Sequence, residues 1–458
     1  MDEKDHHHEK HSPHSGQVRG PRHNASSLAG LFLIFIAAIT YGSYFYGVPG
    51  SVPSNQSQAE SILHDNPLID GHNDLLILLR EFYKNKINGE NFTKPFEKGG
   101  LAGHLDIPRL KKGHQGGAFW SAFVPCPADG FDFSDKNYAA PVKATLEQLD
   151  LFQRLSAKYP DYFTLSRSAK EAEQAFSHGK LISPLAIEGL HQIGNSLATL
   201  RLYHSLGVRY ATLTWNCHNK YADAAVVSVE GKSIASKPYH GGVSQAGRQL
   251  VLEMNRLGML VDLSHVSVDT MRDVLGGSPE KGWKGSVAPP IFSHSSAKAI
   301  CPHPRNVPDD ILRLVKKRNG LVMVNFAPDF VSCEDTGDES GIPSFVEETS
   351  TLAQVVKHIT HVGELIGYEH VGLGTDYDGI ESTPRGLEDV SKFPDLVVAL
   401  LEAGVSAEDA AKVVGRNLLR VWKEVDEVAA RLQKDMEPIE EDLGPIQWDV
   451  EFSYDFDS

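Results

Sequence analysis

Hydrophobic and polar positions alternate in short blocks along most of the chain. Eight short apolar runs stand out, rich in Val, Ile, Leu and Phe and bounded by polar, Gly or Pro residues. Runs of this length and composition are typical of strands buried on both faces of a parallel sheet. They span residues 67–72, 117–124, 181–188, 208–214, 260–265, 290–295, 320–326 and 370–376.

Helical patterns lie between these runs. Residues 145–159 carry apolar side chains three positions apart, and residues 244–258 and 308–320 show a similar period, the last starting at Pro308. Eight strands that alternate with helices over about 310 residues predict an α/β fold, a closed (β/α)8 TIM-like barrel. An open doubly wound sheet is the alternative, but the Gly-rich turn usual after its first strand is missing from residues 69–76.

The N-terminal region predicts a membrane anchor. Residues 1–27 form a polar, His-rich stretch that we expect to be a disordered cytosolic tail. Residues 28–48 carry no charge and are long enough for a transmembrane helix. Arg19 and Arg22 precede this span, so the N-terminus is expected in the cytosol and the body in the lumen or outside the cell, as in a single-pass type II membrane protein. A cleaved signal peptide is the alternative.

The rest of the chain divides by composition. We expect a lumenal stalk over residues 49–66, the barrel over 67–425 and an acidic C-terminal extension over 426–458. Sequons at Asn55 and Asn91 lie beyond the span and predict glycosylation. The net charge of −16 argues against a nucleic-acid partner.

Polar side chains follow the predicted strands where each of them ends. In a parallel barrel these ends meet at one rim, which is where chemistry collects. Histidine and carboxylate ligands together suit Zn²⁺ or a similar divalent ion. The residues are His72, Asp74, Glu188, His265, His294 and Asp376.

Five of these six residues are more ligands than one tetrahedral zinc ion binds. They suit two ions that share Glu188, with His72 and Asp74 on one side and His265 and His294 on the other. Ions about 3.5–4 Å apart can hold a bridging hydroxide that attacks a scissile carbonyl. Asp376, the sixth residue, is then left to transfer protons to and from the reacting groups.

The sequence resembles the membrane (renal-type) dipeptidases, binuclear zinc peptidases of the metal-dependent hydrolase superfamily. The strings that carry the resemblance run from about Leu68 to Trp422 and include IDGHNDL, GGAFWSAFVPC, VDLSHVS, PIFSHSSA and GTDYDG. The resemblance implies two Zn²⁺ per chain on the five ligands above, with Asp376 in catalysis and Arg305 on the substrate carboxylate. It also implies that the substrates are small molecules and that a broad range of dipeptides is hydrolysed.

The even number of cysteines, four, allows three pairings by spacing alone. The resemblance selects Cys126–Cys217 and Cys301–Cys333. No cysteine then remains for a bridge between subunits, so any homodimer is expected to be non-covalent.

One position departs from the family pattern. The family usually has a histidine directly after the fourth strand, whereas this chain has Trp215 there and its nearest histidine at His218. We therefore expect His218 as a candidate substrate contact. Two other functions stay open: the same fold acting on β-lactam or N-acyl amino-acid amides, and a catalytically silent membrane receptor.

Overall fold

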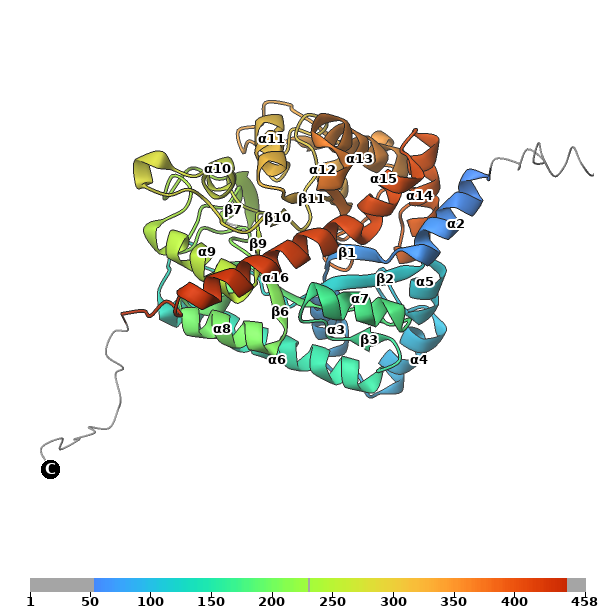
Figure 1. Cartoon of the computed structure of the whole chain (residues 1–458), viewed down its shortest axis with the longest axis horizontal. Helices are drawn as coiled ribbons and strands as arrows, with labels where there is room; N and C mark the ends of the chain where they lie inside the picture. The colour runs from blue at the N-terminus through green and yellow to red at the C-terminus, as the bar shows by residue number, and fades with distance from the viewer. Residues whose placement is uncertain (1–52, 230, 443–458) are drawn as a thin grey trace, which may run out of the picture. The chain divides into compact units, whose positions relative to one another are not determined.

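Eight parallel strands close into a barrel in the computed structural model, which describes residues 53–229 and 231–442 (Figure 1). β1 pairs with β14 on one side and with β2 on the other, which closes the sheet. The prediction of a (β/α)8 barrel is confirmed. The barrel strands are β1 (Leu68–Asn73), β2 (Gln115–Ser121), β5 (Leu185–Glu188), β6 (Val208–Thr212), β9 (Leu260–Asp262), β10 (Ile291–Phe292), β11 (Leu321–Val324) and β14 (Val371–Leu373).

Each of the eight predicted runs overlaps one barrel strand. The run over residues 181–188 differs, because it holds two short strands, β4 (Leu181–Ile182) and β5, separated by Ser183 and Pro184. Proline has no backbone N–H to donate to a sheet, so the ladder is interrupted there. β4 pairs with β2 and with β3 (Phe163–Thr164), outside the barrel circuit.

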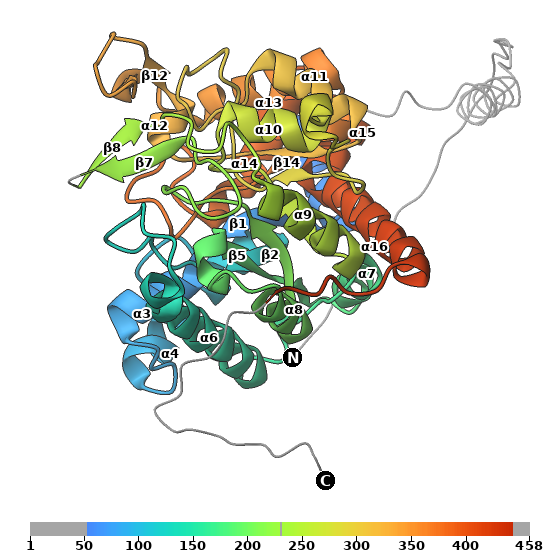
Figure 2. The same ribbon diagram turned by 90° about the vertical axis from the view of Figure 1, so that its left-hand side faces the viewer.

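Helices surround the barrel (Figure 2). The three predicted helices correspond to α6 (Asp135–Lys158), α9 (Gln245–Leu257) and α11 (Asp309–Lys317). α6 begins earlier than predicted because the Ser134 side chain accepts a hydrogen bond from Asn137 N, an N-cap that starts the helix. The other helices are α3 (Leu75–Tyr83), α4 (Glu90–Lys98), α5 (Ile107–Lys112), α7 (Ala169–Ser177), α8 (Leu197–Leu206), α10 (Val268–Gly276), α12 (Pro328–Val331), α13 (Leu352–Ile366), α14 (Phe393–Glu402) and α15 (Ala407–Ala411).

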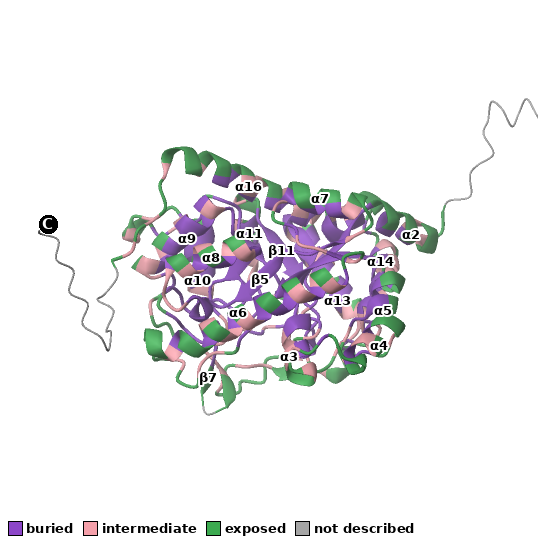
Figure 3. Ribbon diagram, turned by 90° about the horizontal axis from the view of Figure 1, so that it is seen from below, coloured by how far each residue is buried: buried purple, intermediate pink, exposed green. Residues whose placement is uncertain are grey.

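The long helix α16 (Asn417–Asp435) covers the end of the barrel at which the strands begin. Its buried Trp422 packs with Leu260 and Ile291, residues at the starts of their strands, and its ring lies 5.3 Å from that of Phe119. Figure 3 shows the buried strands beneath this helix. The opposite end, where the strands finish, is left for the predicted ligands.

Both predicted ends of the barrel region are occupied by ordered helices. α16 continues to Asp435, past the expected boundary at residue 425, and Val428 is still buried. In the expected stalk, α2 (Asn55–Asp65) packs against α14 through buried residues that include Ile62. Part of the expected stalk is therefore a packed helix, and the acidic tail starts after α16.

Several predictions concern the N-terminal region. The span over residues 28–48 lies outside the described residues, and within 53–229 and 231–442 no helix is both long and apolar enough to cross a membrane. Asn55 is the first residue of α2, and the exposed Asn91 lies in α4. Glycosylation of these two asparagines stays a prediction.

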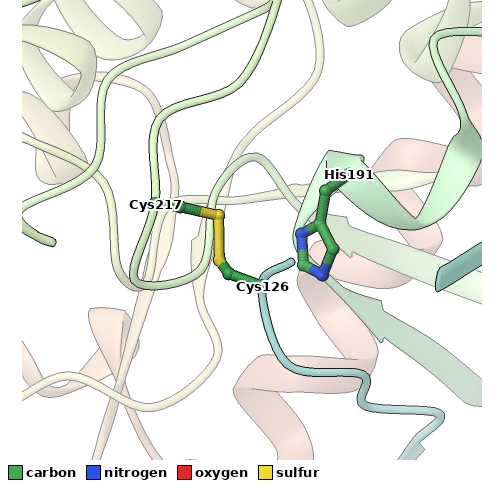
Figure 4. A group of neighbouring side chains, drawn as sticks. All are labelled: Cys126, His191 and Cys217. Carbon is green, nitrogen blue, oxygen red and sulfur yellow. A yellow bond between two sulfur atoms is a disulfide. The ribbon is translucent and has the colours of Figure 1, made fainter. Parts of the chain in front are cut away.

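Two disulfides join loops of the barrel. They are Cys126–Cys217 and Cys301–Cys333, so the pairing implied by the resemblance is confirmed. Cys126–Cys217 ties the loop after β2 to the loop after β6. The imidazole of buried His191 points toward this disulfide (Figure 4), while its Nε2 lies 2.8 Å from Val124 O.

Candidate metal centre

The carboxylate of Glu188 lies among three imidazole rings at the rim where the strands end. Its Oε1 is 2.8 Å from His265 Nε2 and 3.4 Å from His294 Nε2, and its Oε2 is 3.5 Å from His72 Nε2. Glu188 closes β5, and His72 lies in β1. The two carboxylate oxygens therefore face different histidines, as a carboxylate shared by two cations would.

The remaining predicted ligand completes one side of this arrangement. Asp74, the first residue before α3, places its Oδ2 3.1 Å from His72 Nε2. On the other side, His265 Nε2 and His294 Nε2 are 3.0 Å apart. Asp376 joins the first side, because its carboxylate and the ligand atoms of His72 and Asp74 all lie within 4.8 Å of one another. The structure brings all six residues together, and their roles as ligands stay a prediction.

The donor atoms fit a bound cation. His265 Nδ1 is 2.9 Å from Asn216 Oδ1, an oxygen that can only accept, so this nitrogen carries the proton. His265 Nε2 therefore directs a lone pair at Glu188 Oε1, a repulsive contact that a cation bound beside both atoms would relieve. Asp74 Oδ1 is also buried without a hydrogen-bond partner among the described residues. Unpaired acceptors in a buried site are what a metal ion satisfies.

Burial sets the charges of the site. Burial lowers the pKa of His265 and of His294 well below the usual range, and the nearby charges of Arg305 and His72 lower both further, so both rings are neutral at neutral pH. Burial raises the pKa of Glu188 to about 7, although the adjacent His72 acts in the opposite direction. The buried site therefore stabilises its carboxylate charges poorly, and bound cations would offset them.

A cavity of about 560 Å³ opens onto this centre. Glu188, His265 and Asp376 form part of its lining, with Trp215 and Phe330 among the aromatic walls. This volume is large enough for a small ligand.

Arg305 lies behind the wall of this cavity. Its side chain is 2% exposed, and its guanidinium carbon lies over the Phe330 ring, 5.2 Å from the centroid. Within the described residues, Nε, Nη1 and Nη2 have no hydrogen-bond partner. Burial lowers the pKa of Arg305 to about 10, which leaves the group charged at neutral pH. A buried cation with unpaired donors fits an anionic group of a ligand.

Comparison with known proteins identifies the family. The sequence profile described as Membrane dipeptidase (Peptidase family M19) matches residues 56–436. The chain belongs to this family. The match begins within α2 and ends just past α16, so both helices belong to the dipeptidase domain.

Named relatives of this dipeptidase agree. It is 44% identical over 394 residues to the dipeptidase aclJ of Aspergillus oryzae, covering 86% of each chain, and 42% identical over 380 residues to the dipeptidase tcpJ of Claviceps purpurea, covering 83% of this chain and 82% of that one. A metallopeptidase from Rhodobacter sphaeroides, solved with a phosphinate mimic of the dipeptide L-Ala-D-Ala, is 27% identical with a TM-score of 0.64, covering 79% of this chain and 99% of that one. The predicted family is confirmed, and the chain is a metal-dependent hydrolase of peptide bonds.

His218 of the dipeptidase lies away from the cavity and from the candidate metal centre. His218 is buried, with its Nδ1 3.1 Å from Asp223 Oδ1, and it is not among the residues that line the cavity. Trp215 lines the cavity instead, and its ring lies 4.9 Å from that of Phe123 and 6.2 Å from that of His265. The expectation that His218 contacts the substrate therefore has no support in the geometry.

Sequence reasoning missed two buried carboxylates that hold the strand ends of the dipeptidase. Asp262 accepts hydrogen bonds from Ser293 N at 2.7 Å, Ser293 Oγ at 2.6 Å and Thr212 Oγ1 at 2.5 Å. Asp70 accepts in the same way from Thr375 N at 2.8 Å and Thr375 Oγ1 at 2.6 Å. The available signal was an acidic residue inside an apolar run, two or three positions before a histidine predicted as a ligand.

Replacing Asp262 by alanine tests this support. The change leaves several buried donors unpaired, at about 1–3 kcal/mol each, so we expect the free energy of unfolding to fall by about 3 kcal/mol or more. We also expect metal affinity to fall about 10-fold to 100-fold, because the Ser293–His294 strand end is no longer held. Urea unfolding and metal titration measure both, with Asp161→Ala at an exposed position as the control. Unchanged stability and affinity would contradict the assigned role.

Proposed function

We propose that this dipeptidase binds two zinc ions per chain and hydrolyses a broad range of dipeptides. One ion would be held by His72 and Asp74, the other by His265 and His294, with Glu188 shared between them. The mixed imidazole and carboxylate donors and the central place of the Glu188 carboxylate support this assignment. When bound, the ions supply Lewis acidity and activate a water molecule for attack.

The unpaired guanidinium of Arg305 is the observation that carries the substrate assignment. A C-terminal carboxylate would accept its free N–H groups as a bidentate pair and offset its buried charge. This contact would fix a free carboxylate one residue beyond the scissile bond. The cavity offers much apolar wall, including Ile77, Leu78 and Phe123, which supports tolerance for different side chains.

Asp376 is proposed to move the proton. Its backbone N–H donates to His72 O at 3.1 Å, and its left-handed backbone, with φ of 66°, turns the residue at the end of its strand. Burial raises the pKa of Asp376 well above its usual range, which brings proton exchange closer to neutral pH. The carboxylate would accept a proton from the attacking water and return it to the leaving amine.

We also propose that the dipeptidase body lies in the lumen or outside the cell, tethered by the predicted span over residues 28–48. Support comes from the cysteines, since all four are paired in disulfides that persist in oxidising compartments. The tether itself rests on the uncharged stretch of sequence and the arginines before it.

Elemental analysis together with a dipeptide-library assay tests the proposal. We expect two zinc ions per chain, loss of dipeptide hydrolysis on chelation and recovery when zinc is added back. β-Lactam and N-acyl amino-acid substrates, assayed in parallel, should be hydrolysed more slowly. Full activity of the metal-free chain would overturn the zinc proposal, and a metal-free, inert chain would favour the silent receptor.

A further inference from the structure

Part of the cavity wall is acidic. Glu81 of α3 and the residues Asp378 and Glu381, which follow β14, line it. The exposed acids among them need no ligand, because water satisfies them. Asp378 differs, since its side chain is only 1% exposed.

The two oxygens of Asp378 have unequal partners. Oδ1 lies 2.6 Å from His104 N, which donates to it, and 3.2 Å from His104 Nδ1. Asp378 N in turn donates to His104 Nδ1 at 2.9 Å, so the residue is held on both sides. Oδ2 is buried and has no hydrogen-bond partner among the described residues. A buried carboxylate oxygen without a donor is unfavourable unless a ligand supplies one.

This unpaired anion lines the cavity beside α3, whereas the unpaired cation of Arg305 lies behind Phe330. A Cβ placed on Gly103 would lie 2.3 Å from Leu78 Cδ1 and 2.5 Å from Asp378 Oδ1, so Asp378 is packed beside α3. Arg305 is packed on Phe330 of α12. The cavity is therefore lined by one buried negative group, and a buried positive group lies behind its Phe330 wall, each lacking a partner.

We propose that Asp378 binds the α-ammonium group of the dipeptide. The inference rests on the proposed function, in which Arg305 binds the C-terminal carboxylate. A zwitterionic dipeptide would then satisfy both unpaired groups at once through charge-assisted hydrogen bonds. An N-acyl amino acid or a β-lactam without a free amine leaves Asp378 unpaired, and sites with unpaired buried groups discriminate strongly against such analogues. The favoured substrate class is therefore dipeptides with a free N-terminal amine.

The test compares Ala-Gly with propionyl-Gly, which has the same shape but no amine, on the full chain loaded with zinc. The wild type should prefer Ala-Gly in kcat/KM by at least about 10-fold to 100-fold, the range of one charged hydrogen bond. Asp378→Asn keeps the oxygen that faces His104 N and removes the charge. We expect it to raise KM for Ala-Gly by a similar factor and to leave kcat/KM for propionyl-Gly within about two-fold. Asp161→Asn, at an exposed position, is the matched control.

Two results would overturn the inference. Equal losses for both substrates in Asp378→Asn would mean that the residue only supports the loop that carries Asp376. Equal use of both substrates by the wild type would overturn it without any variant, even if Asp378→Asn does not fold. Failure of the proposed function looks different, because the wild type would then hydrolyse neither compound.

Discussion

Replacing Glu188 by alanine is expected to abolish dipeptide hydrolysis, with a loss of at least about 10³-fold in kcat/KM, equivalent to several kcal/mol of transition-state stabilisation. The reason is the place of its carboxylate, whose two oxygens face His265 and His72 at 2.8 Å and 3.5 Å. Both sides of the centre therefore lose a neighbouring carboxylate oxygen in this variant. Steady-state assays of the purified variant, with zinc counted in the same sample, measure the effect.

The stability of the Glu188 variant provides the control. Burial raises the pKa of this carboxyl to about 7, which means that the fold gains little from its charge. The metal-free variant should therefore unfold at a urea concentration close to that of the metal-free parent. Near-normal turnover with both zinc ions retained would end the assignment of Glu188 as the shared ligand.

Replacing Arg305 by methionine is expected to raise KM for dipeptides about 100-fold, because one bidentate charged contact with the substrate carboxylate is lost. We expect kcat to change less, since the guanidinium contacts a group remote from the reacting bond. Methionine fills a similar volume against Phe330 and brings no charge into the buried site. Separate determination of kcat and KM over several dipeptides measures the split.

The same Arg305 variant should not be less stable than the parent. The guanidinium has unpaired buried nitrogens, so its removal breaks no hydrogen bond, and the relief of its desolvation offsets the lost attraction to Asp376 and Glu188. Urea unfolding of both proteins tests this expectation. An unchanged KM, or a large loss of stability, would show that Arg305 serves the fold and not the substrate.

Arg305 and Asp378 would recognise opposite ends of one substrate. Arg305 and Asp378 are buried and oppositely charged, and each has unpaired polar atoms. If both bind substrate, the cavity selects molecules with a carboxylate and an ammonium at a fixed separation. Specificity for the length of the substrate would then come from two charges, while the apolar walls tolerate different side chains.

Much of this protein could be predicted from sequence because the signals are local. A strand buried on both faces is apolar whatever it contacts, so the eight barrel strands were visible in the pattern of the chain. Parallel strands all finish at one rim, so residues such as His72 and Glu188 could be expected to meet. The predicted family is confirmed as well, because its motifs lie at these strand ends.

Other features depend on contacts between residues that are far apart in the chain, and only the tertiary structure decided these. The sequences of α2 and of the end of α16 are mostly polar. Their few apolar residues are buried because those of α2 pack against α14 and those of α16 pack against the starts of the strands. Whether Trp215 or His218 faces the cavity is set in an irregular loop, where Cys126 and Asp223 hold its residues. The missing partners of Arg305 and Asp378 likewise depend on every surrounding group at once. Periodicity records which residues are buried, but it does not record which distant polar group each one meets.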